Sequence, residues 1–240
     1  RTFILMKTVK NDLFDYSNRY IWQMDDGFKF SLDSILLAEY AKVSDNQNIL
    51  DMCTGNAPVP LIISTKTNSS IVGFEIQKDI ANLAKKSVEE NKLTEQIKII
   101  KDDIKNIGNY YEENTFDIIT CNPPYFKENS SLVNKNDYKS LARHEIAINL
   151  DNIFNLGFKY LRNNGILYMV HRPERIDEII ILANRYKMNV KEIALVITNK
   201  SMIPVLVLVK CVKNSKGGIK FRKIYDVSKC TTYQHIFDCE

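Results

Sequence analysis

The chain has 240 residues, of which 45% are hydrophobic and 26% charged, and its formal net charge is +4. These values are ordinary for a globular protein, and no apolar stretch approaches the ~20 residues that a membrane-spanning helix needs. The length suits one α/β domain with short additions, and the mild positive charge is compatible with an anionic partner such as a nucleic acid.

The cysteine and histidine patterns argue against two classes of site. The five cysteines form no C-x-x-C pair and are odd in number, so we expect reduced thiols rather than a disulfide framework or a zinc site. The three histidines lack metal-ligand spacing, and we predict no metal. The apolar start of the chain is interrupted too soon by Lys7 and Lys10 for a secretory signal, so we expect a cytoplasmic protein.

Residues 1–46 are expected to form an N-terminal extension that precedes the main domain. Tyr20–Met24 and Phe28–Phe30 flank the sequence Asp-Asp-Gly, which is a turn signal between two alternating apolar segments and predicts a hairpin. The apolar positions of residues 35–41 then form one broad face, which predicts a helix.

From residue 47 to residue 240, strand patterns alternate with helix patterns, which is typical of βαβ units and a mainly parallel sheet. The predicted strands are 49–52, 71–75, 97–100, 116–120 and 166–170. The predicted helices pass through 61–63, 80–88, 141–161 and 176–183, the third of them closed by Asn164-Gly165. Two further strands, 193–197 and 205–209, have no helical pattern between them and predict an antiparallel pair at the sheet edge.

Candidate site residues lie at the carboxyl ends of the first four predicted strands. These residues are Asp51 and Gly55, then Glu75, Asp103 and Asn122. Ligands of an open parallel sheet lie outside the carboxyl ends of its strands, so we expect these side chains to share one site. Glu75 is placed to accept hydrogen bonds from both hydroxyls of a ribose, and Asp103 from an adenine amino group.

The loop after the first strand indicates the kind of cofactor. A dinucleotide site needs several glycines so that backbone amides can approach a pyrophosphate, and this loop has only Gly55. A nucleoside with a positive centre and an amino-acid end fits better, with Asp51 facing the ammonium group. S-adenosylmethionine is such a cofactor.

The fourth strand ends in Thr120-Cys121-Asn122-Pro123-Pro124-Tyr125-Phe126, whose two prolines hold an amide and two aromatic rings in a rigid loop. This order of segments resembles the Rossmann-like S-adenosylmethionine-dependent methyltransferases, in which Asn-Pro-Pro-Tyr is the amino-methylating signature. The chain departs from the family's glycine-rich loop, because Cys53 and Ala57 stand where the family has glycines.

The resemblance implies catalytic roles for Asn122, Pro123 and Tyr125. The Asn122 side-chain oxygen and the Pro123 carbonyl would accept hydrogen bonds from an exocyclic amino group and aim its nitrogen at the methyl group, with Asn122 also beside the cofactor. Tyr125 would stack on the flipped base, and Phe126 would form the far wall of the substrate pocket.

More narrowly, residues 27–38, 51–56 and 121–126 resemble the bacterial enzymes that methylate N6 of adenine-37 in valine tRNA. The resemblance therefore implies tRNA as the partner, with no membrane partner, and we expect a monomer or weak dimer. Glutamine N5-methyltransferases acting on release factors share Asn-Pro-Pro-Tyr but carry a larger N-terminal domain, and they remain the alternative. A non-catalytic RNA-binding protein on the same fold is another, since fold does not determine function.

The C-terminal segment is basic. Its lysines and arginine are Lys210, Lys213, Lys216, Lys220, Arg222 and Lys223. Such a cluster predicts either a phosphate-contacting surface or a solvated edge of the sheet.

Overall fold

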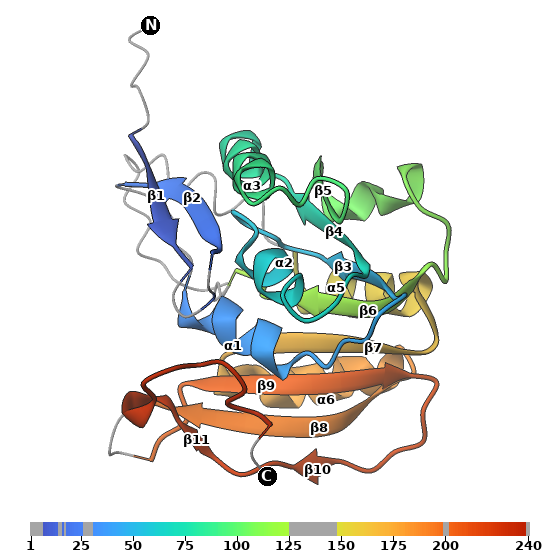
Figure 1. The fold of residues 1–240 in the computed structure, drawn as a ribbon. Helices are drawn as coiled ribbons and strands as arrows, with labels where there is room; N and C mark the ends of the chain where they lie inside the picture. The colour runs from blue at the N-terminus through green and yellow to red at the C-terminus, as the bar shows by residue number, and fades with distance from the viewer. Residues whose placement is uncertain are drawn as a thin grey trace, which may run out of the picture.

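The structure is a computed structural model that describes residues 7–13, 16, 18–25, 31–124, 148–198 and 202–238. At its centre is a nine-stranded sheet of order β10-β8-β9-β7-β6-β3-β4-β5, with β11 also paired to β8 (Figure 1). The strands are β3 (Asn48–Asp51), β4 (Ser70–Glu75), β5 (Ile97–Lys101), β6 (Phe116–Cys121), β7 (Leu161–His171), β8 (Met188–Ile197), β9 (Leu206–Lys213), β10 (Lys220–Phe221) and β11 (Tyr225–Asp226). Strands β3 to β7 are parallel, and β9 runs antiparallel to β7 and β8, so the predicted mixed α/β sheet is confirmed.

Helices cover both faces of the sheet (Figure 1). One face carries α1 (Leu32–Tyr40), α2 (Pro58–Ile63) and α3 (Lys78–Glu90). The other carries η1 (Ile104–Asn109), α5 (Leu150–Tyr160) and α6 (Ile176–Arg185). None of these helices is long and apolar enough to cross a membrane.

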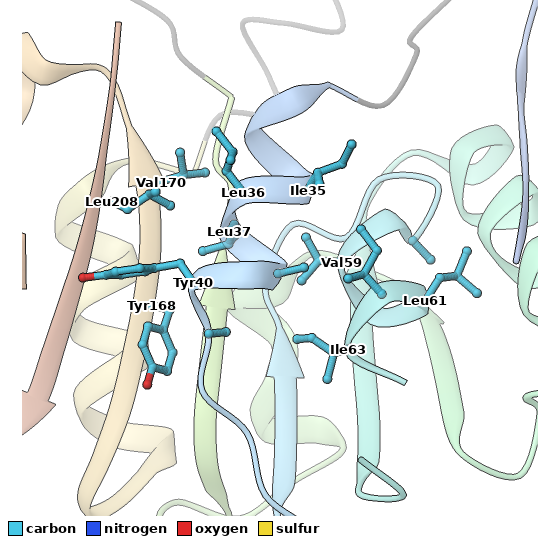
Figure 2. Close-up of a cluster of buried hydrophobic side chains, with 14 of the residues drawn as sticks. Ile35, Leu36, Leu37, Tyr40, Val59, Leu61, Ile63, Tyr168, Val170 and Leu208 are labelled. Atoms are coloured by element: carbon cyan, nitrogen blue, oxygen red, sulfur yellow. The ribbon is translucent and has the colours of Figure 1, made fainter. Parts of the chain in front are cut away.

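Two apolar layers enclose the sheet, one on each face. In the first, Leu36 and Leu37 of α1 are fully buried, and the ring of Tyr40 meets that of Tyr168 on β7 edge to face, with centroids 5.7 Å apart (Figure 2). In the second, Phe116 of β6 and Phe154 of α5 are both buried. Because both faces of the parallel strands are covered, a central strand such as β4 is buried along nearly its whole length, whereas the outer strand β5 exposes Lys98.

The N-terminal hairpin differs from the predicted one. Strand β2 (Tyr20–Met24) lies where it was predicted, but its partner in the structure is β1 (Thr8–Asp12), paired antiparallel. The predicted partner, 28–30, lies outside the described residues. The hairpin packs on α3, where the backbone N–H of Trp22 donates to Ser87 Oγ at 2.9 Å and Lys86 Nζ lies 3.2 Å from the Trp22 ring centroid.

The prediction that Asn164-Gly165 ends a helix is wrong. Helix α5 ends at Tyr160, and the pair lies within β7, where Asn164 adopts a left-handed φ of 62°. The pairing of β6 with β7 shifts register at this place, so the Asn-Gly pair forms an irregularity of the strand. Residues 141–147 of the predicted helix lie outside the described residues.

Two members of the basic C-terminal segment serve the fold. The Lys213 ammonium is buried and donates to Asn114 Oδ1 and to the Leu161 carbonyl, both at 2.7 Å. Arg222 pairs with Glu192 at 3.3 Å and donates to the Phe237 carbonyl at 2.8 Å, which fastens the end of the chain to β8. Neither a phosphate-contacting surface nor a solvated edge describes these two residues, because their charged groups bind other parts of the protein.

A buried carboxylate joins α1 to three other segments. Glu39, 4% exposed, accepts hydrogen bonds from the Tyr16 hydroxyl at 2.5 Å and from the backbone N–H of His235 at 3.0 Å, and it pairs with Lys66 Nζ at 3.2 Å. Burial lowers the pKa of Lys66, although Glu39 opposes that shift. Lys66 also donates to the Ala38 carbonyl at 2.8 Å, so the ammonium is held at the C-terminal end of α1.

We expect Glu39→Ala to lower the free energy of unfolding by about 3 kcal/mol, because the substitution leaves Lys66 and Tyr16 without their buried acceptor. Urea unfolding followed by circular dichroism measures the change. Glu90→Ala is the matched control, since it removes an exposed glutamate that pairs with Lys10 at 2.5 Å, and it should change stability little. Equal effects of the two substitutions would contradict the prediction.

Candidate active site

A cavity of about 420 Å³ lies at the carboxyl ends of β3, β4, β5 and β6. Of the predicted site residues, Gly55, Glu75, Asp103, Asn122 and Pro123 line it. Asp51 lies just before the lining residues Met52 and Cys53, whereas Tyr125 and Phe126 lie outside the described residues. The structure thus brings Gly55, Glu75, Asp103 and Asn122 to one cavity at this edge of the sheet, whereas Asp51 is not among the lining residues.

Asp51 is the most deeply placed of these residues. It is 1% exposed, and its Oδ1 accepts a hydrogen bond from Thr120 Oγ1 on the neighbouring strand at 2.7 Å. Its other oxygen, Oδ2, is buried without a hydrogen-bond partner among the described residues. Burial raises the pKa of Asp51 to about 6. A buried carboxylate with one unpaired oxygen favours a cationic ligand, which would compensate the lost hydration.

Glu75 shapes the loop after β3 as well as the cavity. Its Oε2 accepts from the Gly55 N–H at 3.0 Å, and its Oε1 accepts from the Gln77 N–H at 2.8 Å. Burial raises its pKa, while these two backbone hydrogen bonds oppose the shift. Each carboxylate oxygen has a second lone pair, so both retain capacity to accept from a ligand.

The loop turns through two left-handed residues, Gly55 with a φ of 56° and Ala57 with a φ of 73°. Ala57 is one of the two positions where the sequence departs from the glycines of the family it resembles. The structure gives the physical reason for a glycine there, since a residue with a Cβ is strained in this conformation.

Two neighbouring aspartates close the cavity at the end of β5. The Asp103 side chain accepts from the Lys105 N–H at 3.0 Å and pairs with Lys105 Nζ at 3.2 Å, so it caps η1. Asp102, which the sequence did not single out, accepts from the Tyr110 hydroxyl at 2.8 Å and from Asn106 Nδ2 at 2.9 Å. The hydrogen bond from Asn106 is the main reason that the pKa of Asp102 is lowered.

Asn122 follows β6 and faces an element that the sequence did not connect to it. Its Nδ2 donates to Ser34 Oγ on α1 at 3.0 Å, and Ser34 is only 5% exposed. Two neighbours of Ser34, Ser31 and Asp33, line the same cavity. The N-terminal turn of α1 therefore belongs to the site, although Ser34 and Asn122 are 88 positions apart in the sequence and nothing in the sequence connects them.

The cavity is lined by carboxylates, the side-chain amides of Gln77 and Asn122, and apolar side chains. Within the described ranges, no three side chains among His, Cys, Asp and Glu lie together in a way that could hold a metal ion. The four described cysteines, Cys53, Cys121, Cys211 and Cys230, carry free thiols.

Gly73 of β4 lies opposite Asp51 in the sheet, and a Cβ added to it would lie 2.7 Å from Thr54 Oγ1. We expect Gly73→Ala to displace Thr54 and lower the free energy of unfolding by about 2 kcal/mol. Because Thr54 belongs to the loop that lines the cavity, the affinity for S-adenosylmethionine, measured by calorimetry, should also fall. Gly217→Ala is the matched control, because a Cβ there meets nothing within 4 Å, and similar affinity losses in both variants would oppose this account.

Comparisons with known proteins agree with this geometry. The family model described as "Methyltransferase domain" matches residues 43–226. The chain is 26% identical to the tRNA1(Val) (adenine(37)-N6)-methyltransferase of Bacteroides thetaiotaomicron, with 91% of each chain covered. It is 25% identical to the protein of the same name from Shewanella sediminis, with 71% of each chain covered.

Solved structures share the fold. A predicted O-methyltransferase, protein Atu636 from Agrobacterium tumefaciens, superposes with a TM-score of 0.64 at 17% identity, covering 85% of this chain and 91% of that one. The TYW2 protein of M. jannaschii in complex with AdoMet superposes with a TM-score of 0.57 at 12% identity, covering 86% of each. The Rossmann-like methyltransferase fold is confirmed, and with the family match over residues 43–226 the chain belongs to the methyltransferase-domain family.

Proposed function

We propose that this protein transfers a methyl group from S-adenosylmethionine to the exocyclic N6 of an adenosine in tRNA, and that the adenosine is adenine-37 beside the anticodon of valine tRNA. The observation that carries the proposal is the Asn122 amide at the end of β6, lining one cavity together with Pro123, Glu75 and Asp103. The relatives named for this reaction support the choice of substrate. With a tRNA substrate, the enzyme acts in the cytoplasm.

The residues of the cavity fit S-adenosylmethionine. The unpaired oxygen of Asp51 is a buried acceptor for the cofactor's ammonium group, reached directly or through one bridging water. Glu75 accepts from the ribose hydroxyls with its remaining lone pairs, and Asp103 accepts from the adenine amino group. Gly55 lines the cavity beside them and carries no side chain that would occupy it. When bound, the cofactor supplies a methyl group on a positively charged sulfur.

Asn122 and Pro123 hold and orient the nucleophile. The exocyclic nitrogen of adenine is a weak nucleophile because its lone pair is delocalised into the ring. Hydrogen bonds from its two N–H groups to Asn122 Oδ1 and the Pro123 carbonyl favour a pyramidal nitrogen that points at the methyl group. Positioning supplies most of the rate, and the nitrogen loses its extra proton to water after the transfer. We assign Tyr125 to stacking on the flipped base and Phe126 to the far wall, from the sequence motif alone.

The deciding experiment identifies the product. The protein is incubated with methyl-labelled cofactor and with either total tRNA or release factor, and the modified nucleoside or side chain is identified by mass spectrometry. Label in N6-methyladenosine supports the proposal, whereas label in a glutamine side chain would support the release-factor alternative. Cofactor binding without transfer to either substrate would favour the non-catalytic alternative.

We further propose that the segment 216–224 contacts the tRNA backbone. Lys216, Lys220 and Lys223 are exposed in it, and they alternate with exposed apolar side chains, of which Phe221 is 66% exposed. Lysines interleaved with an exposed aromatic ring suit phosphates and a stacked base. The segment is paired to β8, whose carboxyl end lies at the same edge of the sheet as that of β7, since both strands are antiparallel to β9.

Reversing both charges with Lys220→Glu and Lys223→Glu should weaken tRNA binding about tenfold at 0.1 M salt, and should reduce the slope of log K against log salt by about 1 per lysine. Filter binding over a salt series measures both quantities, and cofactor affinity should stay unchanged. The matched control is Lys98→Glu, an exposed lysine on β5 near the opposite edge of the sheet. A salt slope equal to that of the unmodified protein would contradict the assignment.

A further inference from the structure

The contact between Ser34 and Asn122 joins the N-terminal helix to the proposed catalytic amide. Ser34 lies in the first turn of α1, between Asp33 of the cavity wall and the buried Ile35. Its hydroxyl oxygen accepts a hydrogen bond from Asn122 Nδ2 at 3.0 Å, in surroundings where Ser34 is 5% exposed. The Ser34 end of this hydrogen bond is therefore shielded from water, whereas Asn122 is half-buried and also lines the cavity.

The consequence lies in the chemistry of an amide, whose two ends differ. The nitrogen end can only donate hydrogen bonds, whereas the oxygen end can only accept them. Binding an exocyclic amino group through its N–H requires the oxygen end. When Asn122 Nδ2 donates to Ser34, Asn122 Oδ1 points away from α1. If the amide group rotated by 180°, its two N–H groups would take the place of the oxygen that must accept from the substrate amino group.

Helix α1 gives Ser34 a rigid support. Ile35, Leu36 and Leu37 are at most 1% exposed and pack between the sheet and α2 (Figure 2). At the far end of the helix, Glu39 is held by Lys66 and by the His235 N–H. A side chain on a packed helix can fix a neighbour more accurately than one on a loop.

We propose that Ser34 is a positioning residue, which fixes the orientation of the Asn122 amide so that its oxygen faces the amino group of the substrate. The inference deepens the proposed amino methylation and rests on it. Ser34 touches neither the substrate nor the methyl group, and it acts through Asn122. The same logic predicts that the serine becomes dispensable when residue 122 has no donor end.

The first test uses Ser34→Ala. We expect kcat to fall about tenfold, because the amide loses the hydrogen bond that selects one orientation, while the KM for cofactor and the melting temperature change little. Ser34→Thr, which keeps the hydroxyl, should restore most of kcat. Ser64→Ala is the control, since it removes another buried serine hydroxyl at a helix end, bonded to the Leu61 carbonyl at 2.7 Å, and should leave kcat unchanged.

The second test repeats Ser34→Ala in an Asn122→Asp background. A carboxylate presents an oxygen in either orientation, so the loss of kcat should shrink to less than about threefold. Equal losses in both backgrounds, or a loss of kcat matched by losses in cofactor affinity and melting temperature, would overturn the proposal.

A third measurement is independent of turnover and of the identity of the substrate. The side-chain ¹⁵N–H₂ signals of Asn122, assigned by their disappearance in Asn122→Asp, should shift or broaden in Ser34→Ala and stay in place in Ser64→Ala. Unchanged Asn122 signals in Ser34→Ala would overturn the role of Ser34. A failure of the unmodified enzyme to methylate adenosine would instead contradict the proposed function, and the two failures are thereby separated.

Discussion

Replacing Asn122 with alanine is expected to lower kcat for methylation of tRNA by about 10²-fold, the loss typical when one preorganised hydrogen-bond partner of a developing charge is removed. Positive charge develops on the amino nitrogen as it attacks, and the bound N–H groups become stronger donors at that moment. The Asn122 oxygen therefore interacts more strongly with the transition state than with the bound substrate. The loss should appear in kcat more than in KM for tRNA.

Two controls make this result specific. Cofactor affinity, measured by calorimetry, should change by less than about tenfold, because the ammonium and ribose contacts involve other residues. Asn48→Ala removes another asparagine amide, which donates to the Thr115 carbonyl at 3.2 Å at the amino end of β3, and it should leave kcat intact. Full transfer by Asn122→Ala with normal cofactor binding would contradict the assignment of this amide.

The sequence was sufficient to predict where the described strand-end residues meet. Runs such as residues 116–120 carry apolar side chains on both faces, which is typical of buried parallel strands, and parallel strands bring their carboxyl ends to one edge. Glu75, Asp103 and Asn122 could therefore be placed together without knowing any contact between side chains. The same argument placed Asp51 at that edge, but it could not show that this carboxylate lies below the cavity wall.

Contacts between segments far apart in the chain could not be predicted from the sequence. Nothing in the sequence distinguishes Ser34 from an ordinary serine in a helix. Only the packing of α1 on the sheet brings it to Asn122. Strand β1 is short and polar, so it carries little apolar alternation and depends on pairing with β2. The prediction that Asn164-Gly165 ends a helix was wrong for a related reason. An Asn-Gly pair with a left-handed residue can end a helix, but it can equally form an irregularity within a strand.

The second large effect concerns Asp51, whose pKa burial raises from 3.8 to about 6. Relative to the unfolded chain, folding favours the protonated form of Asp51, so the contribution of this group to stability is fully present below about pH 4 and is lost as the pH rises through 6. The difference amounts to about 3 kcal/mol, because each pKa unit corresponds to 1.36 kcal/mol. We expect Asp51→Asn to remove this loss, so the cofactor-free variant should unfold at a higher urea concentration than the unmodified protein at pH 7.5.

Asp45→Asn is the matched control for stability, and it should have the opposite sign. Asp45 accepts hydrogen bonds from the Asn68 N–H at 3.0 Å and the Thr67 hydroxyl at 2.9 Å, and the Asn68 hydrogen bond is the main cause of its lowered pKa. Its ionised form therefore favours the folded state, so the amide should destabilise the protein at neutral pH. A less stable Asp51→Asn protein at pH 7.5 would contradict the interpretation of Asp51 as an uncompensated buried charge.

Cofactor binding should show the reverse dependence on pH. If the ionised Asp51 carboxylate accepts from the cofactor ammonium, affinity falls as Asp51 becomes protonated, by about tenfold between pH 7 and pH 5 for a pKa near 6. Calorimetry across this range should give a sloping curve for the unmodified protein and a flatter, weaker one for Asp51→Asn. If cofactor affinity changed with pH by the same slope in the unmodified protein and in Asp51→Asn, the pH dependence would belong to another group, such as Glu75. The same carboxylate would then be unfavourable for the empty protein and favourable for the complex, so that cofactor binding compensates a charge that folding leaves unpaired.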